Sequence, residues 1–309
     1  MPLSVAGFGP LALAIGFGSV WVAMPATLPY SAASHGALWR LSPDLARVEA
    51  RIPVGWAPAS IAVTATAVWV ADSRGDGSNP HGRQDLVERV DPGSDSVTDS
   101  IAVADPQRIV AVAGAIWVVP GARDGTTDML RISDSGAAAV TAAVTGTVSD
   151  VQVDGADLWI ATNGESGGSG TLLRADATSG TIVATIPLGA DIGGVLAASG
   201  RILAIESVGA TDAVGVRTID PAANAPSGPV RRSGALVGSA LRVVGDHVWV
   251  GNQGAIASVD LRSLLPDTRP LSVLDAPGSS VIAIDGDAGA LWVLTGTGVV
   301  RIIETLPAS

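Results

Sequence analysis

The sequence has no cysteine and no lysine, and it has only three histidines. Without cysteine, disulfide bonds, thiolate metal sites and a cysteine nucleophile are all excluded. The histidines do not form a metal-binding pattern such as H-E-x-x-H. Cysteine and histidine, two residue types that often serve as nucleophiles, bases or metal ligands, are therefore absent or scarce. The sequence predicts no catalytic residue and no dedicated metal ligand.

Charged side chains are also few, at 15% of the 309 residues, and the acidic ones prevail to give a net charge of −11. All 18 basic residues are arginines. Binding to nucleic acid requires a basic face that neutralises phosphate groups. We therefore expect no nucleic-acid partner.

An apolar run that could span a bilayer is missing as well. Residues 3–17 are the best candidate, but they are shorter than the roughly 20 residues that a membrane helix needs. They also lack the basic start of a signal peptide, because the first basic residue is Arg40. We expect strands here, with no membrane span and no signal peptide in this chain. An extracytoplasmic location is expected in preference to a cytoplasmic one, with any export signal outside this chain.

What the sequence does contain is apolar residues, at 47%, together with 38 glycines and 19 prolines. This composition supplies a large core and excludes a disordered chain. Many glycines and prolines are typical of short strands joined by tight turns. No segment shows a 3.6-residue apolar period over the length of a helix.

A tryptophan-centred strand returns through the chain, as in "TAVWVAD" at 66–72. Six tryptophans and one leucine stand at the same point of this repeat: Trp21, Trp69, Trp117, Trp159, Leu203, Trp249 and Trp292. They are 42 to 48 residues apart, which matches one four-stranded propeller blade. A large aromatic at this point is expected to fill the space between adjacent blades.

Every repeat but the last contains four strand signals, which in the second unit lie at 61–63, 67–71, 86–90 and 96–103. The sequence therefore predicts an all-β, seven-bladed β-propeller that forms a single domain over residues 1–309. The last unit lacks a fourth strand, and residues 2–6 resemble one. We expect these residues to complete the last blade, so that the ring closes with three strands from one end and one from the other. Such closure removes exposed sheet edges.

The repeat, with "VWVAD" followed by "V-x-R-V-D-P", resembles the YVTN and NHL-type propellers, and is most similar to the bacterial streptogramin B lyase-like proteins. In that family the tryptophan strand tends to read W-F-T-E, and catalysis is attributed to a Glu-x-His element with further acidic residues. The position three residues after the anchor is occupied here by Met24, Asp72, Pro120, Thr162, Glu206, Asn252 and Thr295. Only Glu206 keeps the glutamate, and no Glu-x-His occurs. The lyase motif is therefore not retained.

Arginine recurs on the third strand of six units, with Ser258 in the sixth unit: Arg40, Arg89, Arg131, Arg174, Arg217 and Arg301. An acidic residue or serine usually follows within three positions, as Asp91 follows Arg89. We interpret these evenly spaced arginines as a framework of surface pairs and turn contacts.

The start of each first strand and the end of each second strand are expected to share one face. Arg108 and Asp150 precede first strands of neighbouring blades, and two interpretations stay open. They pair with each other, or they help to line a polar funnel that binds a ligand. The funnel candidates are Trp56, Ser60, Asp72, Arg108, Asp150, Asn163, Glu206 and Asn252.

The loops after the second strands of the first two units carry His35 and His81, with Asp72 and Asp76 close to His81 in sequence. They form either a His/carboxylate metal site or, as we expect, a solvated loop.

The leading functional hypothesis is a non-enzymatic binding or scaffold module, because the framework is well kept and an acid–base constellation is missing. It would recognise a small molecule or a protein on one loop face, as the sensor or surface domain of a larger bacterial protein. The alternative is a streptogramin lyase-like or lactonase-like metal-assisted enzyme, using Asp72, Asp150 and Glu206 in the funnel. No cofactor is expected, and a divalent cation in the central channel is the open alternative.

Overall fold

Every regular element in the described part of the chain is a β-strand. The computed structural model describes residues 1, 9–26, 34–73, 84–164, 170–198, 200–207, 214–238, 240–244, 247–252, 255–266, 271–272, 280–287 and 290–302. Within these ranges there is no helix that is long and apolar enough to cross a membrane.

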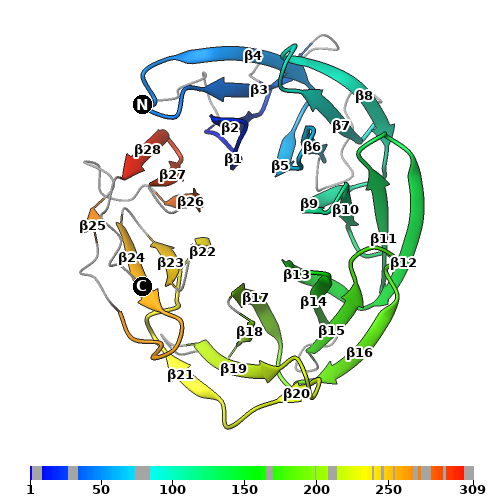
Figure 1. The fold of residues 1–309 in the computed structure, drawn as a ribbon, viewed down its shortest axis with the longest axis vertical. Coiled ribbons are helices and arrows are strands. Elements are labelled where there is room, and N and C mark those ends of the chain that lie inside the picture. The colour runs from blue at the N-terminus through cyan, green and yellow to red at the C-terminus, as the bar shows by residue number, and fades with distance from the viewer. Residues whose placement is uncertain are drawn as a thin grey trace.

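The strands form seven antiparallel sheets arranged as a ring, with the first strand of each sheet innermost (Figure 1). Blade 1 contains β1 (Ala12–Gly16), β2 (Ser19–Met24), β3 (Gly36–Leu41) and β4 (Val48–Val54). Blade 2 contains β5 (Pro58–Val63), β6 (Val68–Asp72), β7 (Leu86–Asp91) and β8 (Ser96–Ala102). Blade 3 contains β9 (Pro106–Val112), β10 (Ala115–Pro120), β11 (Thr126–Ser133) and β12 (Ala138–Thr145). Blade 4 contains β13 (Thr147–Asp154), β14 (Asp157–Asn163), β15 (Thr171–Asp176) and β16 (Ile182–Pro187).

The last three blades are less regular. Blade 5 contains β17 (Ile192–Ala198), β18 (Arg201–Glu206), β19 (Val214–Asp220), β20 (Ala225–Pro226) and β21 (Arg231–Ser233), the last two both pairing with β19. Blade 6 contains β22 (Ala240–Val244), β23 (His247–Asn252), β24 (Ala255–Asp260) and β25 (Leu271–Ser272). Blade 7 contains β26 (Val281–Gly286), β27 (Leu291–Thr295) and β28 (Gly298–Ile302). The predicted seven-bladed propeller is confirmed.

The N-terminus lies at the last blade. The amino group of Met1 donates to the carbonyl of Val299 at 2.7 Å, and the amide of Val299 donates to the carbonyl of Met1 at 3.1 Å. This reciprocal pair is typical of an antiparallel ladder and joins the two ends of the chain at β28. Residues 2–6, which were predicted to form the closing strand, lie outside the described residues.

Each blade presents its connections on two faces. The inner strands begin and the second strands end on one face, as the pairing of Pro58 with Asp72 shows. We call this the upper face. The turns between first and second strands and between third and fourth strands lie on the other side, the lower face. The predicted sharing of a face by these loops is confirmed.

The core is divided among the gaps between blades. In the described part of the chain there are seven buried apolar clusters, and each is shared by two adjacent blades. Each anchor packs toward the following blade, and the tryptophan anchors are at most 3% exposed. Because a sheet buries both faces only by packing on its neighbours, these side chains fill the space that the ring geometry creates.

Several anchors also bind the next blade through the indole N–H. Trp117 Nε1 donates to the carbonyl of Ala177 at 2.8 Å, and Trp292 Nε1 donates to the carbonyl of Pro43 at 3.0 Å. Both acceptors lie in the turn between the third and fourth strands of the following blade. Gly180 in the turn beside Trp117 has a φ of +71°, and a Cβ there would lie 2.5 Å from the indole ring. This turn therefore requires glycine.

The repeated arginines lie opposite the anchors. Five of them pair in register with the tryptophan of the same blade: Arg40, Arg89, Arg131, Arg174 and Arg301. The guanidinium carbons of Arg40, Arg174 and Arg301 lie 5.4 to 5.5 Å from the indole centroids, a cation–π distance. Arg40 also donates to the carbonyl of Pro92 in the next blade at 2.8 Å. The repeated arginines thus connect adjacent blades, in addition to forming surface pairs.

Blade 5 departs from this pattern. Thr218 lies opposite the anchor Leu203, and Arg217 lies opposite Ala204. Since successive side chains of a strand point to opposite faces, Arg217 is on the other face of the sheet and binds the buried carboxylate of Glu206 through Nε and Nη2. The predicted equivalence of Arg217 with the other framework arginines is therefore wrong.

Candidate functional site

The mouth of the central channel, on the upper face, is built by the starts of β5, β9 and β13. Arg108 of blade 3 and Asp150 of blade 4 form an ion pair through Nη1 and Oδ1, which confirms the first of the two interpretations of these residues. Ser60 of blade 2 accepts a hydrogen bond from the amide of Ile109 at 3.2 Å. Three predicted residues from consecutive blades therefore lie along one arc.

The carboxylate of Asp150 is held by backbone as well as by arginine. Its Oδ2 accepts from the amide of Val195 in blade 5 at 2.9 Å, and its Oδ1 accepts from the amide of Val151 at 2.9 Å. The Asp150 side chain is only 15% exposed, whereas the Arg108 side chain is 43% exposed. The acid is thus fixed in the wall, and the guanidinium group is the part that solvent reaches.

A second ion pair crosses from blade 6 to blade 7 deeper in the channel. Arg242 Nη2 lies 2.7 Å from Asp285 Oδ1. In register these residues lie opposite Trp249 and Trp292, at the level of the anchors. Asp285 Oδ2 also accepts from the amide of Ile15 in blade 1 at 3.0 Å. The same device, a carboxylate that binds both an arginine and the inner strand of the next blade, thus occurs twice.

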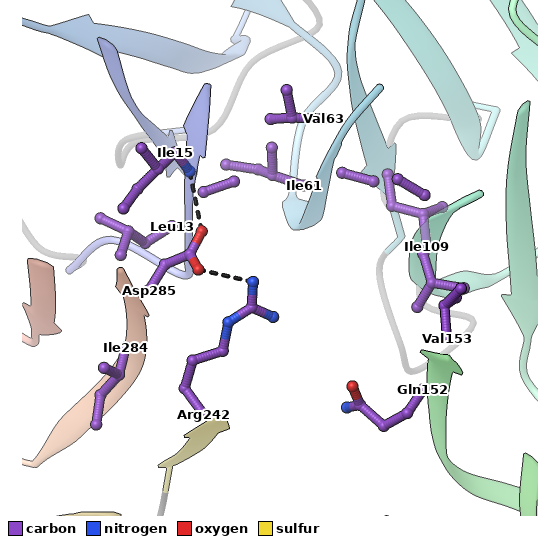
Figure 2. A pocket seen from close by; sticks show the side chains of 14 residues that line it. Leu13, Ile15, Ile61, Val63, Ile109, Gln152, Val153, Arg242, Ile284 and Asp285 are labelled. Carbon is purple, nitrogen blue, oxygen red and sulfur yellow. Dashed lines mark hydrogen bonds and ion pairs between the residues drawn. The ribbon is translucent and has the colours of Figure 1, made fainter. Parts of the chain in front are cut away.

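This second pair borders a cavity of about 310 Å³ in the channel (Figure 2). Apolar side chains of β1, β5, β9 and β26 surround it, and Gln152 of β13 projects into the same space as Arg242. The inner strands are sheet edges, so some of their backbone groups face this space without a neighbouring strand. Backbone N–H and C=O groups need hydrogen-bond partners, which makes the cavity suited to a polar occupant.

Trp56 and Asp72 lie in a separate cleft on the upper face, between blades 1 and 2. Asp72 accepts from the amides of Trp56 at 2.7 Å and Ala57 at 2.5 Å. Glu88 accepts from the amide of Gly55 at 2.6 Å. Two buried carboxylates therefore bind three consecutive amides of the connection between the blades. The cleft has a volume of about 360 Å³ and is also lined by His35 and Leu86.

Burial raises the pKa of the Glu88 carboxyl, and the nearby charge of Asp72 raises it further. The hydrogen bonds from the Gly55 amide and from Ser100 oppose this shift in part, because they favour the ionised form. Glu88 is 6% exposed. Burial thus destabilises the ionised form of Glu88, while the carboxylate holds the connection between blades 1 and 2 in place.

The structure brings only some of the proposed metal ligands together. His35 and Asp72 line the same cleft, whereas His81 and Asp76 lie outside the described residues. Within the ranges that the structure describes, no three histidine, aspartate or glutamate side chains gather closely enough to hold a metal ion.

The three remaining funnel candidates lie elsewhere. The Asn163 amide binds both backbone groups of Ile192, with Oδ1 accepting at 2.7 Å and Nδ2 donating at 2.9 Å. Glu206 is 3% exposed and binds Arg217. Asn252 borders a separate, mostly apolar hollow of about 250 Å³ beside Val250. The eight candidates are thus divided among the channel mouth, a cleft, a blade boundary, a buried ion pair within blade 5 and a hollow.

The ion pair of Arg242 and Asp285 was missed by the sequence reasoning, although a signal for it exists. Both residues stand seven positions before the anchor of their unit. The same position in the other units is occupied by Ala14, Ala62, Val110, Gln152 and Leu196. Two opposite charges in adjacent units, at a position otherwise neutral, mark a pair on the channel wall.

No protein-family model matches the sequence, and no curated protein matches it either. Similar solved structures include Kuenenia stuttgartiensis hydrazine synthase, with a TM-score of 0.70 and 14% identity over 98% of this chain and 97% of that chain. The WD40 β-propeller domain of Doa1 has a TM-score of 0.66 and 11% identity, over 99% and 96% of the two chains. BamB from Moraxella catarrhalis has a TM-score of 0.55 and 14% identity, over 97% and 99%. At these identities the similarity shows the propeller fold alone.

Proposed function

We propose that the protein is a non-catalytic binding module that holds a small ligand at the mouth of the channel on the upper face. The main observation in its support is the arc of Ser60, Arg108 and Asp150. In this arc the carboxylate is fixed by backbone amides, and the guanidinium group is solvent-accessible. An arginine held in this way is oriented before a ligand arrives. Preorganisation of this kind reduces the entropic cost of binding.

The enzyme alternative receives less support from the geometry. It requires Asp72, Asp150 and Glu206 to act on one ligand, but these carboxylates bind different groups in blades 2, 4 and 5. Hydrazine synthase is named as an enzyme, while the fold alone hosts unrelated functions. The function must therefore be argued from the site. A place among the YVTN and NHL-type propellers, as the binding domain of a larger bacterial protein, is part of this proposal.

A fragment library screened by ligand-observed NMR tests the proposal. Hits on the unmodified protein would be measured again on the double variant Arg108→Ala/Asp150→Ala and on Arg47→Ala. Arg47 is a suitable control because its side chain is 68% exposed in a lower-face turn and pairs with Glu49. Hits that bind the control but lose binding to a folded double variant would support the proposal. Hits that bind all three proteins equally would overturn it.

A further inference from the structure

The level of the channel at which the anchors lie has an unusual composition. Seven residues, one from each blade, pair in register with the anchors: Ala14, Ala62, Val110, Gln152, Leu196, Arg242 and Asp285. Four of these are apolar, Gln152 is polar and uncharged, and the two charged residues are neighbours in the ring. An ion pair placed among small apolar side chains has few groups nearby that would compete for it.

The acid of this pair is held by three donors. Asp285 Oδ1 accepts from the amide of Gly286 at 3.0 Å and from Arg242, and Oδ2 accepts from the amide of Ile15 at 3.0 Å. The Asp285 side chain is 13% exposed. Two backbone amides therefore stabilise the negative charge independently of the arginine.

The base of the pair is directed into the open space. Arg242 is 49% exposed and contacts Asp285 through one terminal nitrogen. Figure 2 shows its other terminal nitrogen turned toward the space that Gln152 borders from the opposite wall. A guanidinium group has five N–H donors in a planar fork that matches a carboxylate. This arrangement supplies a donor fork with an amide facing it.

The surrounding cavity sets the size and polarity of an occupant. Its volume of about 310 Å³ corresponds to roughly ten water molecules, at about 30 Å³ each. Backbone groups at the inner-strand edges and the amide of Gln152 supply further donors and acceptors. A ligand with a carboxylate for Arg242 and hydroxyl groups for Gln152 and the backbone would match the polar groups of this space.

We propose that the channel at this level binds a small hydroxycarboxylate, with its carboxylate on Arg242 and its hydroxyl groups on Gln152 and the inner-strand edges. This inference rests on the proposed binding function and names the chemical class of the ligand. The simpler interpretation is an ion pair that only joins blades 6 and 7. The two differ in whether the guanidinium group binds anything besides Asp285.

Isothermal titration with D-gluconate tests the proposal, because sorbitol has the same six-carbon hydroxylated chain without the carboxylate. We expect gluconate to bind in the millimolar range or tighter, and sorbitol to bind at least tenfold more weakly. Arg242→Gln should reduce gluconate affinity at least tenfold, while Arg47→Gln, which removes the same charge from the surface, should leave it unchanged. Arg242→Lys keeps the charge without the planar fork and should bind with intermediate affinity.

Equal binding of gluconate and sorbitol, or the absence of gluconate binding, would overturn the proposal without any variant being needed. Unchanged gluconate affinity in folded Arg242→Gln would overturn it as well. Failure here is distinguishable from failure of the proposed function. Fragment hits that depend on Arg108 but not on Arg242 would preserve a binding module while excluding a hydroxycarboxylate at this level.

Discussion

At the scale of single residues, the anchors combine apolar packing with a hydrogen bond that only some of them make. Trp117 is fully buried and donates to Ala177 in the next blade. Trp159 is equally buried, but its Nε1 finds no acceptor among the described residues. Packing is therefore the shared role of the anchors, and the indole N–H adds a variable contribution.

Truncation of Trp117 to alanine should lower the free energy of unfolding by about 3–5 kcal/mol, as for large core aromatics. Trp117→Phe should cost about 1 kcal/mol more than Trp159→Phe, because only the first change removes a hydrogen bond. Urea denaturation followed by circular dichroism measures both. A loss below about 1 kcal/mol in Trp117→Ala would contradict the packing role, given the cost expected for a buried aromatic.

Glu88 gives a prediction on pH. Its pKa is raised above its ordinary value of 4.5 in the folded protein, chiefly by burial. The folded state then binds more protons than the unfolded state between 4.5 and the folded pKa, so ionisation of Glu88 destabilises the fold as pH rises through this window. Glu88→Gln cannot titrate. The stability of the unmodified protein relative to this variant should therefore fall with rising pH, and parallel curves in urea denaturation between about pH 5 and 8 would contradict the assignment.

Many of the single-residue roles could be predicted from the sequence, because the anchors repeat and their spacing gives the length of one blade. The contact between Arg108 and Asp150 was one of two interpretations. Glu88 was missed because it stands next to a framework arginine and looks like a surface residue. Its burial depends on the connection at Gly55, which a strand pattern does not reveal.

At the scale of elements, the place of the arginine on β19 explains why blade 5 differs. Arg217 stands one residue before the position opposite the anchor, so its side chain points to the opposite face of the sheet. Arg217 is thereby removed from the anchor and bound to Glu206, while Arg201 at the start of β18 donates to the carbonyl of Leu261 in blade 6 at 3.2 Å. Loss of the tryptophan, the displaced arginine and the buried ion pair thus occur together in blade 5.

Arg217→Ala should destabilise the protein by about 3–5 kcal/mol, because it leaves a buried carboxylate without its counter-ion. The double variant Glu206→Leu/Arg217→Leu should recover most of this loss, since no charge remains in the layer. Thermal and urea unfolding of the three proteins measure this difference. A double variant no more stable than Arg217→Ala would contradict the pairing. The sequence carries a signal for this difference, because Arg217 stands three residues before Asp220 whereas Arg89 stands two before Asp91. Matching the units on their arginines hides it.

At the scale of the whole molecule, residues that repeat between units and residues that differ between units lie in different parts of the ring. Repeated residues lie between blades and on the lower-face turns, where they join neighbours. Residues that differ between units line the channel, as Arg108 and Arg242 do, or the upper-face cleft, as Asp72 does. The ring could be predicted from the sequence because it depends on the repeated part. The division of the funnel candidates could not, because it depends on which connection folds against which blade.

Hydrogen–deuterium exchange of the protein, with and without the strongest fragment hit, tests the binding site most directly. Inner-strand amides that face the channel have no neighbouring strand on that side, and those that no side chain holds exchange readily unless a ligand covers them. The predicted result is slower exchange confined to the starts of β5, β9 and β13, and its loss in Arg108→Ala/Asp150→Ala. Protection confined to the outer strands, with the inner strands unchanged, would contradict a binding site in the channel.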